Sequence, residues 1–248
     1  MNPEGLQRYL AFYQDLGIRT LWRRAAPAFP AARPVAEADP PVAAAAETRS
    51  LFTEEAPADD SLAKIREDIG ECTRCRLHQG RTTIVFGDGN EKAKLVFVGE
   101  GPGAEEDAQG LPFVGRAGQL LTQMIEGTAR KEGIPLLRRD VYICNVVKCR
   151  PPENRTPLPD EMETCSQFLF RQLAVIRPKA ICCLGATAAR ALLGRKEGVT
   201  RLRGNWYHWR GIPVMVTYHP SYLLRPYNQS AKREAWEDLK KVLHYVYD

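Results

Sequence analysis

The sequence predicts an α/β protein, a three-layer α/β/α sandwich around a mostly parallel central sheet. Short apolar runs typical of buried strands occur at residues 95–98, 141–144, 180–184 and 212–217. Segments with apolar residues at helical spacing separate these runs. Parallel strands need a crossover between them, usually a helix, and strands buried on both faces are continuously apolar. The two observations therefore favour the same architecture.

The expected helices follow the strands in order. Folded structure should begin near Ser61, where Asp60 or Ser61 can cap a helix that ends near Gly70. Further helices are expected at residues 117–131, 160–176, 186–193 and 231–245. In the first of these, Leu120, Leu121, Met124 and Ile125 form the buried stripe, and Asp160 is expected to cap the second. Residues 204–209 and 212–217 flank Arg210 and Gly211 and are expected to form a hairpin or an adjacent strand pair.

Three segments differ in composition. Residues 1–24 contain an amphipathic helical pattern, residues 25–60 form an Ala/Pro-rich flexible linker without apolar periodicity, and residues 61–248 are the folded domain. We prefer an N-terminal helix that docks on its own domain. A partner-binding helix is the alternative, and it makes residues 1–60 a candidate site for a protein partner.

Composition and charge narrow the function classes. The chain has 248 residues, 44% hydrophobic and 26% charged, which is typical of a soluble globular protein. No apolar run approaches the ~20 residues of a membrane helix, and no secretory signal opens the chain, so a cytoplasmic protein without a membrane partner is expected. Residues 1–60 hold six basic and nine acidic residues, against 29 and 21 in the remainder. A basic folded portion suits a polyanion such as nucleic acid.

A glycine-rich loop follows the first apolar run. Glycines stand at positions 99, 101 and 103, with Glu100 inside the loop. The loop can be a phosphate-binding loop, a tight βα turn or an active-site loop in which Glu100 positions a water. It lacks the GxGxxG and GxxxxGK[ST] patterns, which argues against the first. Gly101, Asn145 and His219 each follow an expected strand, so they should gather at one edge of the sheet, where α/β proteins bind ligands.

Seven cysteines, without a secretory signal, argue for metal ligation rather than disulfides. Cys72 and Cys75 have C-x-x-C spacing, which is compatible with a redox dithiol, half a zinc site or half an iron–sulfur site. Cys149 follows a strand and Cys165 lies on a helix, a dispersal that suits a cuboidal cluster. The other three, Cys144, Cys182 and Cys183, lie in apolar strands and are expected to be core residues.

Several motifs together resemble one family. They are GEGPGAEED at 99–107, PFVG at 112–115, Asn145 with KCRPP at 148–152, HPSYLLR at 219–225, and four of the cysteines. Over roughly residues 61–243, and in the same order, the chain resembles the family 4 uracil-DNA glycosylases, the iron–sulfur type of bacteria and archaea. Ala104 departs from the pattern, because many members carry another Glu there, and the N-terminal extension is additional.

The resemblance implies a function. The expected protein is a monofunctional uracil-DNA glycosylase, a monomer that flips uracil out of double- or single-stranded DNA. It would hydrolyse the N-glycosidic bond and leave an abasic site for base-excision repair. The resemblance also assigns a 4Fe–4S cluster to Cys72, Cys75, Cys149 and Cys165, with zinc at the same positions as the alternative. A non-catalytic nucleic-acid-binding or redox module, and a glycosylase for another deaminated base, are the rival functions.

The resemblance further implies roles for individual residues. Phe113 would stack on the extruded base, with Gly101 in the uracil pocket, and Asn145 would pair with uracil N3–H and O4. His219 would donate a hydrogen bond to uracil O2, and Glu100 would orient the water or stabilise the cationic sugar. Each can instead be structural, as a core aromatic, a strand-end amide or a buried histidine.

The expected DNA contacts follow the same motifs. Leu223 and Leu224 would wedge into the space of the extruded base, and Arg225 would hold a phosphate. Ser221, Lys148 and Arg150 are also assigned to DNA binding, and Arg155 can add a phosphate contact. The alternative for the leucines is a helix start with buried side chains.

Overall fold

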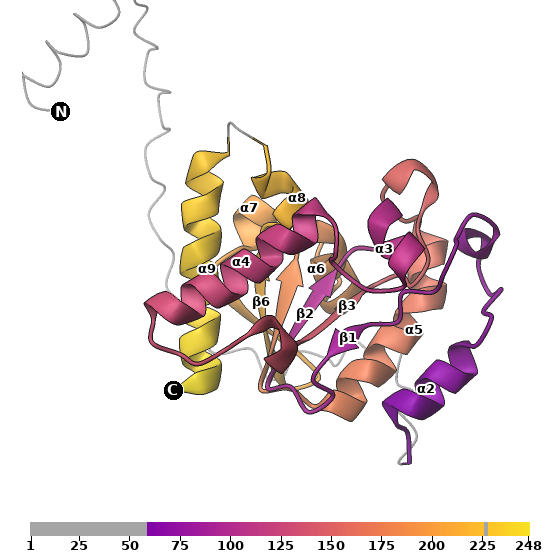
Figure 1. Cartoon of the computed structure of the whole chain (residues 1–248), viewed down its shortest axis with the longest axis horizontal. Helices are drawn as coiled ribbons and strands as arrows, with labels where there is room; N and C mark the ends of the chain where they lie inside the picture. Colours follow the sequence, from indigo (N-terminus) through magenta and orange to yellow (C-terminus); the bar gives the residue numbers. More distant parts are fainter. Residues whose placement is uncertain (1–58, 226–227) are drawn as a thin grey trace, which may run out of the picture. The chain divides into compact units, whose positions relative to one another are not determined.

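The computed structural model describes residues 59–225 and 228–248 (Figure 1). The predicted N-terminal helix at 1–24 and all but the last two residues of the predicted linker at 25–60 lie outside this part. Within it, none of the helices combines the length and apolarity needed to cross a membrane.

A mixed sheet forms the centre of the fold. In the described residues it has six strands in the order β1-β3-β2-β4-β6-β5. Their bounds are Asp88–Gly89 (β1), Leu95–Gly99 (β2), Tyr142–Asn145 (β3), Ala180–Leu184 (β4), Trp206–Trp209 (β5) and Ile212–Thr217 (β6). The four inner strands are parallel, and β1 and β5 pair antiparallel at the edges. The predicted fold class is confirmed, and so is the hairpin across Arg210 and Gly211.

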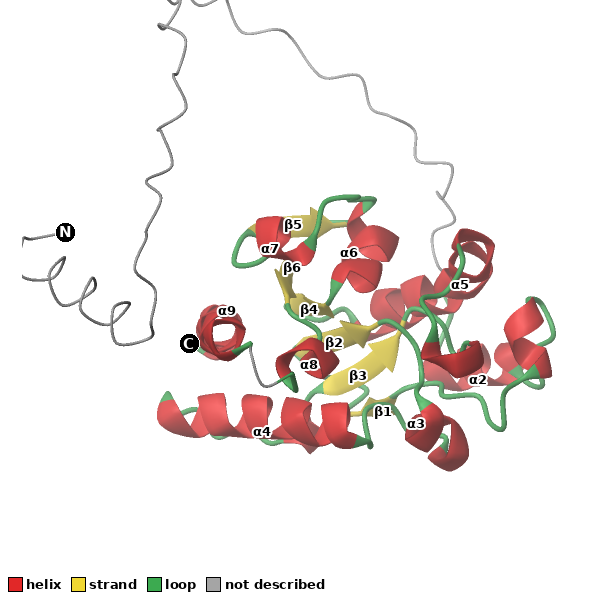
Figure 2. Cartoon of the chain, turned by 90° about the horizontal axis from the view of Figure 1, so that it is seen from above, coloured by secondary structure: helices red, strands yellow, loops and turns green. Residues whose placement is uncertain are grey.

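Helices cover both faces of the sheet (Figure 2). Helices α2 (Leu62–Ile69), α5 (Pro159–Ile176) and α6 (Ala186–Leu193) share one core cluster, and α4 (Arg116–Lys131) and α9 (Gln229–Tyr247) share the other. Shorter elements are η1 (Arg76–Gln79), α3 (Ala104–Gln109), η2 (Arg138–Asp140), η3 (Pro152–Asn154), α7 (Val199–Leu202) and α8 (Pro220–Leu223).

Strand β2 shows why the central strands of the sheet are apolar on both faces. Leu95 and Phe97 belong to the core shared with α4 and α9, whereas Val96 and Val98 belong to the core on the opposite face. All four side chains are completely buried, as expected for a central parallel strand. Burying one such side chain contributes about 1.5–3 kcal/mol, so the sheet is a rigid base for the loops at its carboxyl edge.

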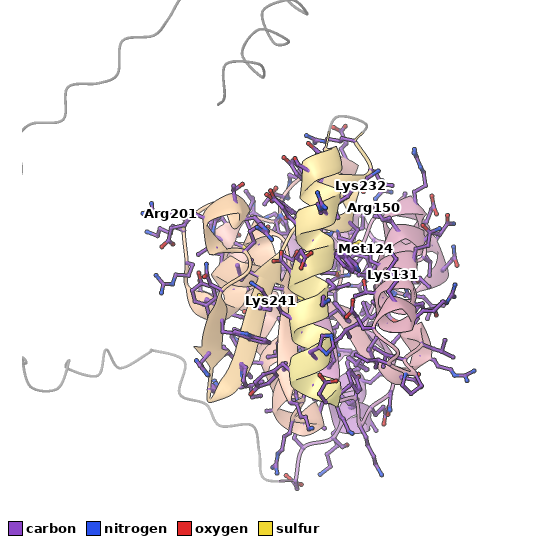
Figure 3. All side chains as sticks on the ribbon, turned by 90° about the vertical axis from the view of Figure 1, so that its left-hand side faces the viewer. Met124, Lys131, Arg150, Arg201, Lys232 and Lys241 are labelled. Atoms are coloured by element: carbon purple, nitrogen blue, oxygen red, sulfur yellow. The ribbon has the colours of Figure 1, made fainter. Side chains whose placement is uncertain are left out.

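The layer of α4 and α9 can be followed in Figure 3, where Met124 and Lys131 of α4 are labelled beside α9. Leu121 and Ile125 are fully buried, and Met124 is half-buried against the same core. The Lys131 ammonium lies 5.3 Å from the centroid of the Trp236 ring on α9, a cation–π contact. The predicted apolar stripe of this helix therefore points where expected.

Two predicted helix caps have different outcomes. Ser61 caps α2, because its hydroxyl accepts from the Lys64 amide at 3.1 Å. Asp160 does not cap α5, and that prediction is wrong: Pro159 takes the first helical position and Leu158 precedes it. The Glu161 carboxylate accepts from the Leu158 amide at 2.7 Å instead. Glu161 is fully buried, and its hydrogen bonds from the Arg155 guanidinium lower its pKa.

Candidate active site

Three parallel strands end at one cavity. Strand β2 leads into Glu100 and Gly101, β3 ends at Asn145, and β6 is followed by Tyr218 and His219. The strand arrows in Figure 1 run towards the end of the sheet where α3 and α8 lie. A cavity of about 350 Å³ opens there, and its lining includes Glu100, Gly101, Phe113, Asn145, His219 and Ser221. The structure thus brings together six side chains or loop positions that the sequence placed in the site.

Glu100 is held from a fourth strand end. The hydroxyl of Thr187, at the start of α6, donates to the Glu100 carboxylate. Gly185 directly before the helix has a φ of 98°, which favours glycine, and this turn brings Thr187 over the end of β4. Thr187 was missed by the sequence analysis. The available signal was a hydroxyl residue two positions after a glycine that ends a buried strand.

Glu106 connects the glycine loop with the segment that carries Phe113. Its carboxylate accepts from the Gly103 amide at 3.1 Å and from the Val114 and Gly115 amides at 2.9 Å each. Three main-chain donors are therefore satisfied by one side chain from α3. Glu106 could not be recognised from the sequence as a link between the two loops, because its contacts with Val114 and Gly115 are identified only by the fold.

Phe113 forms a wall of the cavity in an unusual backbone conformation. Its φ is 53°, in the left-handed region that non-glycine residues rarely adopt. Its ring centroid lies 5.6 Å from that of His219. Helix α4 passes so close that a Cβ on Gly118 would lie 1.8 Å from the Phe113 carbonyl oxygen, so only glycine fits there. The Arg138 guanidinium donates to the Pro112 carbonyl at 2.7 Å and fixes the same segment.

Asn145 presents an unpaired acceptor to the cavity. Its side chain is 1% exposed, and its Oδ1 has no hydrogen-bond partner among the described residues. A Cβ on Gly99 would lie 2.4 Å from this oxygen and 2.6 Å from the Phe113 ring, so glycine at 99 leaves room for both side chains. An unpaired buried carbonyl costs about 1–3 kcal/mol, which a ligand with an N–H donor would offset.

His219 is a neutral donor at physiological pH. Burial lowers its pKa to about 4, although the negative charge of Glu106 opposes the shift. Its Nδ1 accepts from the Ser221 amide at 3.2 Å and lies 2.8 Å from the Ser221 hydroxyl oxygen. Because the amide can only donate, Nδ1 is the acceptor and the ring proton is on Nε2. The Nε2–H group is then available to the cavity.

Comparison with known proteins shows which family this chain belongs to. The model of the uracil DNA glycosylase superfamily matches residues 86–240. A type-4 uracil-DNA glycosylase of Thermotoga maritima is 49% identical over 190 residues, 76% of this chain and 96% of that protein. Those of Sulfurisphaera tokodaii and Archaeoglobus fulgidus are 45% and 44% identical, each over 74% of this chain and over 84% and 92% of the relatives. The chain belongs to the type-4 uracil-DNA glycosylases.

The structure of this type-4 glycosylase corrects part of the predicted DNA contact set. Leu223 is 1% exposed and packs against Tyr218, Ala231 and Ala235. It is a core residue, so its prediction as a DNA wedge is wrong. Leu224 next to it is half-buried and Arg225 is exposed, so both stay candidates for DNA contact.

Lys148 is the second correction. Its side chain is completely buried, so a contact with a DNA phosphate is excluded and that prediction is wrong. Its ammonium donates to the Asn145 carbonyl at 2.8 Å and to Gln172 Oε1 at 2.6 Å. Arg150, labelled in Figure 3, is half-buried and its Nε donates to Asn154 Oδ1 at 2.8 Å. Arg150 and Ser221 stay predictions.

The four cysteines predicted as cluster ligands lie near this segment, because Cys149 follows Lys148 and Cys165 Sγ accepts from the Lys148 amide. Burial raises the pKa of the Cys149 thiol; the hydrogen bond and positive charge of Arg81 oppose this shift, and negative charge on Cys75 and Cys72 adds to it. Burial likewise raises the pKa of Cys165 to about 12, with added contributions from Cys149 and Cys75. Cys149 therefore lies within electrostatic range of Cys72 and Cys75, and Cys165 lies within range of Cys149 and Cys75.

The surroundings of these thiols suit an iron–sulfur cluster. Arg81 donates to Cys149 Sγ at 3.4 Å, and the Lys148 amide donates to Cys165 Sγ at 3.3 Å. In residues 59–225 and 228–248, no three His, Cys, Asp or Glu side chains are arranged around a single metal ion. A cuboidal cluster binds each thiolate to a different iron, so its ligands need not surround one ion. Cys144, Cys182 and Cys183 are fully buried in strands, as predicted.

Proposed function

We propose that this protein is a monofunctional uracil-DNA glycosylase, which flips uracil out of DNA and hydrolyses its N-glycosidic bond. It leaves an abasic site for base-excision repair. The observation that carries this proposal is the unpaired, buried Asn145 Oδ1, which faces the same cavity as the neutral His219 ring. Membership of the type-4 family supports it.

Uracil satisfies the polar groups of this cavity. Asn145 Oδ1 accepts from uracil N3–H, while its amide donates to O4. Cytosine presents an acceptor at N3 and a donor at position 4, so it would leave both Asn145 groups facing like groups. The Phe113 ring, which forms the adjacent wall, stacks on the face of the base.

Hydrolysis places opposite charges on the two sides of the breaking bond. When the bond from C1′ to uracil N1 breaks, its electron pair moves into the uracil ring and charge develops on O2. His219 Nε2–H donates to this oxygen and stabilises the anion. Glu100, oriented by Thr187, stabilises the cationic sugar and orients the water whose oxygen bonds to C1′. The proton that this water loses neutralises the departing uracil anion. The lining residues of the described chain offer no lysine as the nucleophile of a lyase step.

The proposal also covers the cofactor and the DNA contacts. Cys72, Cys75, Cys149 and Cys165 would hold a 4Fe–4S cluster, which supplies structural cross-linking and takes no part in the hydrolysis. Leu224, Arg225, Ser221 and Arg150 would contact DNA. We further propose a cytoplasmic monomer, in which residues 1–60 are the candidate site for a protein partner.

The decisive experiment measures excision from a uracil-containing oligonucleotide under single-turnover conditions. Asn145→Asp replaces the amide donor with a carboxylate and should lower the rate by ~10²–10³-fold, because matched buried hydrogen bonds are lost. Asn205→Asp makes the same charge change at an exposed site and is the control. Unchanged excision in Asn145→Asp would refute the pocket assignment. Wild-type protein that excises no uracil would favour a non-catalytic module.

The cofactor is tested on the same preparation. Anaerobically purified protein should absorb broadly near ~400 nm and contain roughly four irons per chain, as a Cys₄-ligated cluster requires. Stoichiometric zinc instead of iron would overturn this part of the proposal.

A further inference from the structure

Lys148 is a buried lysine whose function is not explained by the contacts of the active site described above. It is completely buried, although lysine is almost never buried without a partner of opposite charge. The two acceptors of its ammonium are both neutral: the main-chain carbonyl of Asn145 and the side-chain carbonyl of Gln172. Its position excludes DNA, so its contacts must act within the protein.

The first contact controls the peptide that carries the uracil-reading side chain. Asn145 is the last residue of β3, opposite Gly99 in the register of β2. The chain then follows the glycine loop, with Val146 and Val147 amides donating to the Gly99 and Glu100 carbonyls. The Asn145 carbonyl receives its hydrogen bond from Lys148 at 2.8 Å. This bond fixes the plane of the peptide after Asn145, and with it the direction of the Asn145 side chain.

The second set of contacts anchors the lysine. Gln172 on α5 accepts from Lys148 and donates through Nε2 to the Phe86 carbonyl at 3.0 Å. The main-chain amide of Lys148 makes a separate contact, because it donates to Cys165 Sγ. Cys149, another proposed cluster ligand, is the next residue. One residue therefore contacts both the uracil-reading peptide and the group of cysteines.

We propose that Lys148 is a positioning residue for uracil recognition, which ties the main chain of Asn145 to helix α5 and to the cysteine cluster. This inference rests on the proposed function of the cavity and adds a residue that touches neither base nor DNA. The Asn145 side chain must lie within about 0.5 Å of its productive position to pair with N3–H and O4 together. Loss of the Lys148 contact frees the peptide and misaligns the pair.

The test is a double-mutant cycle between Lys148→Met and Asn145→Ala. Lys148→Met retains the length of the side chain and removes its donors. On single-stranded uracil substrate it should lower the single-turnover rate by ~10²-fold, since a misplacement of about 1 Å can cost that much. In the Asn145→Ala background it should lower the rate no further, because the side chain that it positions is absent. An equal loss in both backgrounds would indicate general damage and overturn the proposal.

Two further measurements separate positioning from other roles. Iron content and the visible spectrum of Lys148→Met report whether the protein still binds the iron–sulfur cluster next to this residue. The salt dependence of DNA affinity should be unchanged, whereas a lost phosphate contact would reduce the slope by about 1. A reduced slope would contradict the buried position and overturn the proposal.

Gln172→Met provides a second variant in case Lys148→Met does not fold. It leaves the lysine in place and removes its side-chain acceptor, so a smaller loss of rate is expected, again absent in the Asn145→Ala background. Full activity of Lys148→Met, or of Gln172→Met if Lys148→Met does not fold, would overturn this inference. Excision of uracil by the wild-type protein would still uphold the proposed function. Wild-type protein without excision would overturn both.

Discussion

Replacement of His219 tests how the cavity stabilises the departing base. His219→Ala removes the Nε2–H donor that the Ser221 contacts leave free. Loss of one donor to a developing oxyanion costs ~10²–10³-fold in rate, or about 2.7–4 kcal/mol. Because uracil O2 becomes anionic only as the bond breaks, the affinity for uracil-containing DNA should fall much less than the rate.

The low pKa of His219 also predicts how the free energy of unfolding depends on pH. Burial lowers it to about 4, from an ordinary value of 6.5. Between pH 6.5 and pH 4 the imidazole is protonated in the unfolded chain but stays neutral in the folded protein. The free energy of unfolding therefore falls as the pH is lowered through this interval. The loss reaches about 3 kcal/mol, at 1.36 kcal/mol for each pH unit of the shift. In His219→Ala this part of the pH dependence should be absent.

The assay is single-turnover excision from double- and single-stranded uracil substrates at pH 5 to 8. The wild-type rate should show no inflection from His219 near pH 6.5, because the ring stays neutral throughout. His208→Ala, an exposed histidine on β5, is the matched control. If His219→Ala keeps nearly the full rate, or if single-stranded substrate rescues it, His219 is structural. The catalytic role would then move to Glu100 and the backbone of the glycine loop.

Three other perturbations have distinct expected outcomes. Leu224→Ala should weaken extrusion of the base and be rescued by single-stranded or mismatched uracil, which costs less to flip; lack of rescue would exclude a wedge. Leu223→Ala should instead lower the free energy of unfolding by about 2–5 kcal/mol, as measured by denaturant titration. Thr187→Val removes a hydrogen bond to the Glu100 carboxylate and should lower the single-turnover rate about tenfold or more, since bonds to charged groups contribute about 1.5–3 kcal/mol; an unchanged rate would show that the loop alone orients Glu100. Removal of residues 1–58 should leave excision from short oligonucleotides nearly unchanged, and loss of activity would show that the domain begins earlier.

The sequence predicted the sheet because burial on both faces leaves a local signal. The residues of the four parallel strands are almost all apolar, and glycines stand at the ends of β2 and β4. The same signal placed Gly101, Asn145 and His219 at one edge, where the structure brings them to one cavity. No local signal separates a buried lysine from an exposed one. Lys148 stands in a K-C-R run that resembles a phosphate-binding segment, yet all residues from 141 to 149 are buried.

The errors and omissions share a physical origin. Leu223 and Leu224 are adjacent, and the phase of the short helix α8, which begins after His219, decides which one points into the core. Glu106 and Thr187 act through hydrogen bonds to segments that lie eight to 87 residues away. Such partners follow from the tertiary structure, so the sequence could at most indicate Thr187 by its place after a strand-ending glycine and could not identify its partner.

Hydrogen bonds distinguish the roles of three of the four acidic residues in the GEGPGAEED segment, Glu100, Glu106 and Asp107. Glu106 accepts from three main-chain amides, and Asp107 accepts from the Thr82 amide at 2.9 Å and is 3% exposed. These carboxylates hold loops together, and their oxygens are already occupied. The Glu100 carboxylate accepts a hydrogen bond from the Thr187 hydroxyl and otherwise faces the cavity. A carboxylate that is oriented through one oxygen can still accept from a water through the other. Among these three acids, Glu100 is therefore the one that can act on the substrate, whereas the other two hold the surrounding loops.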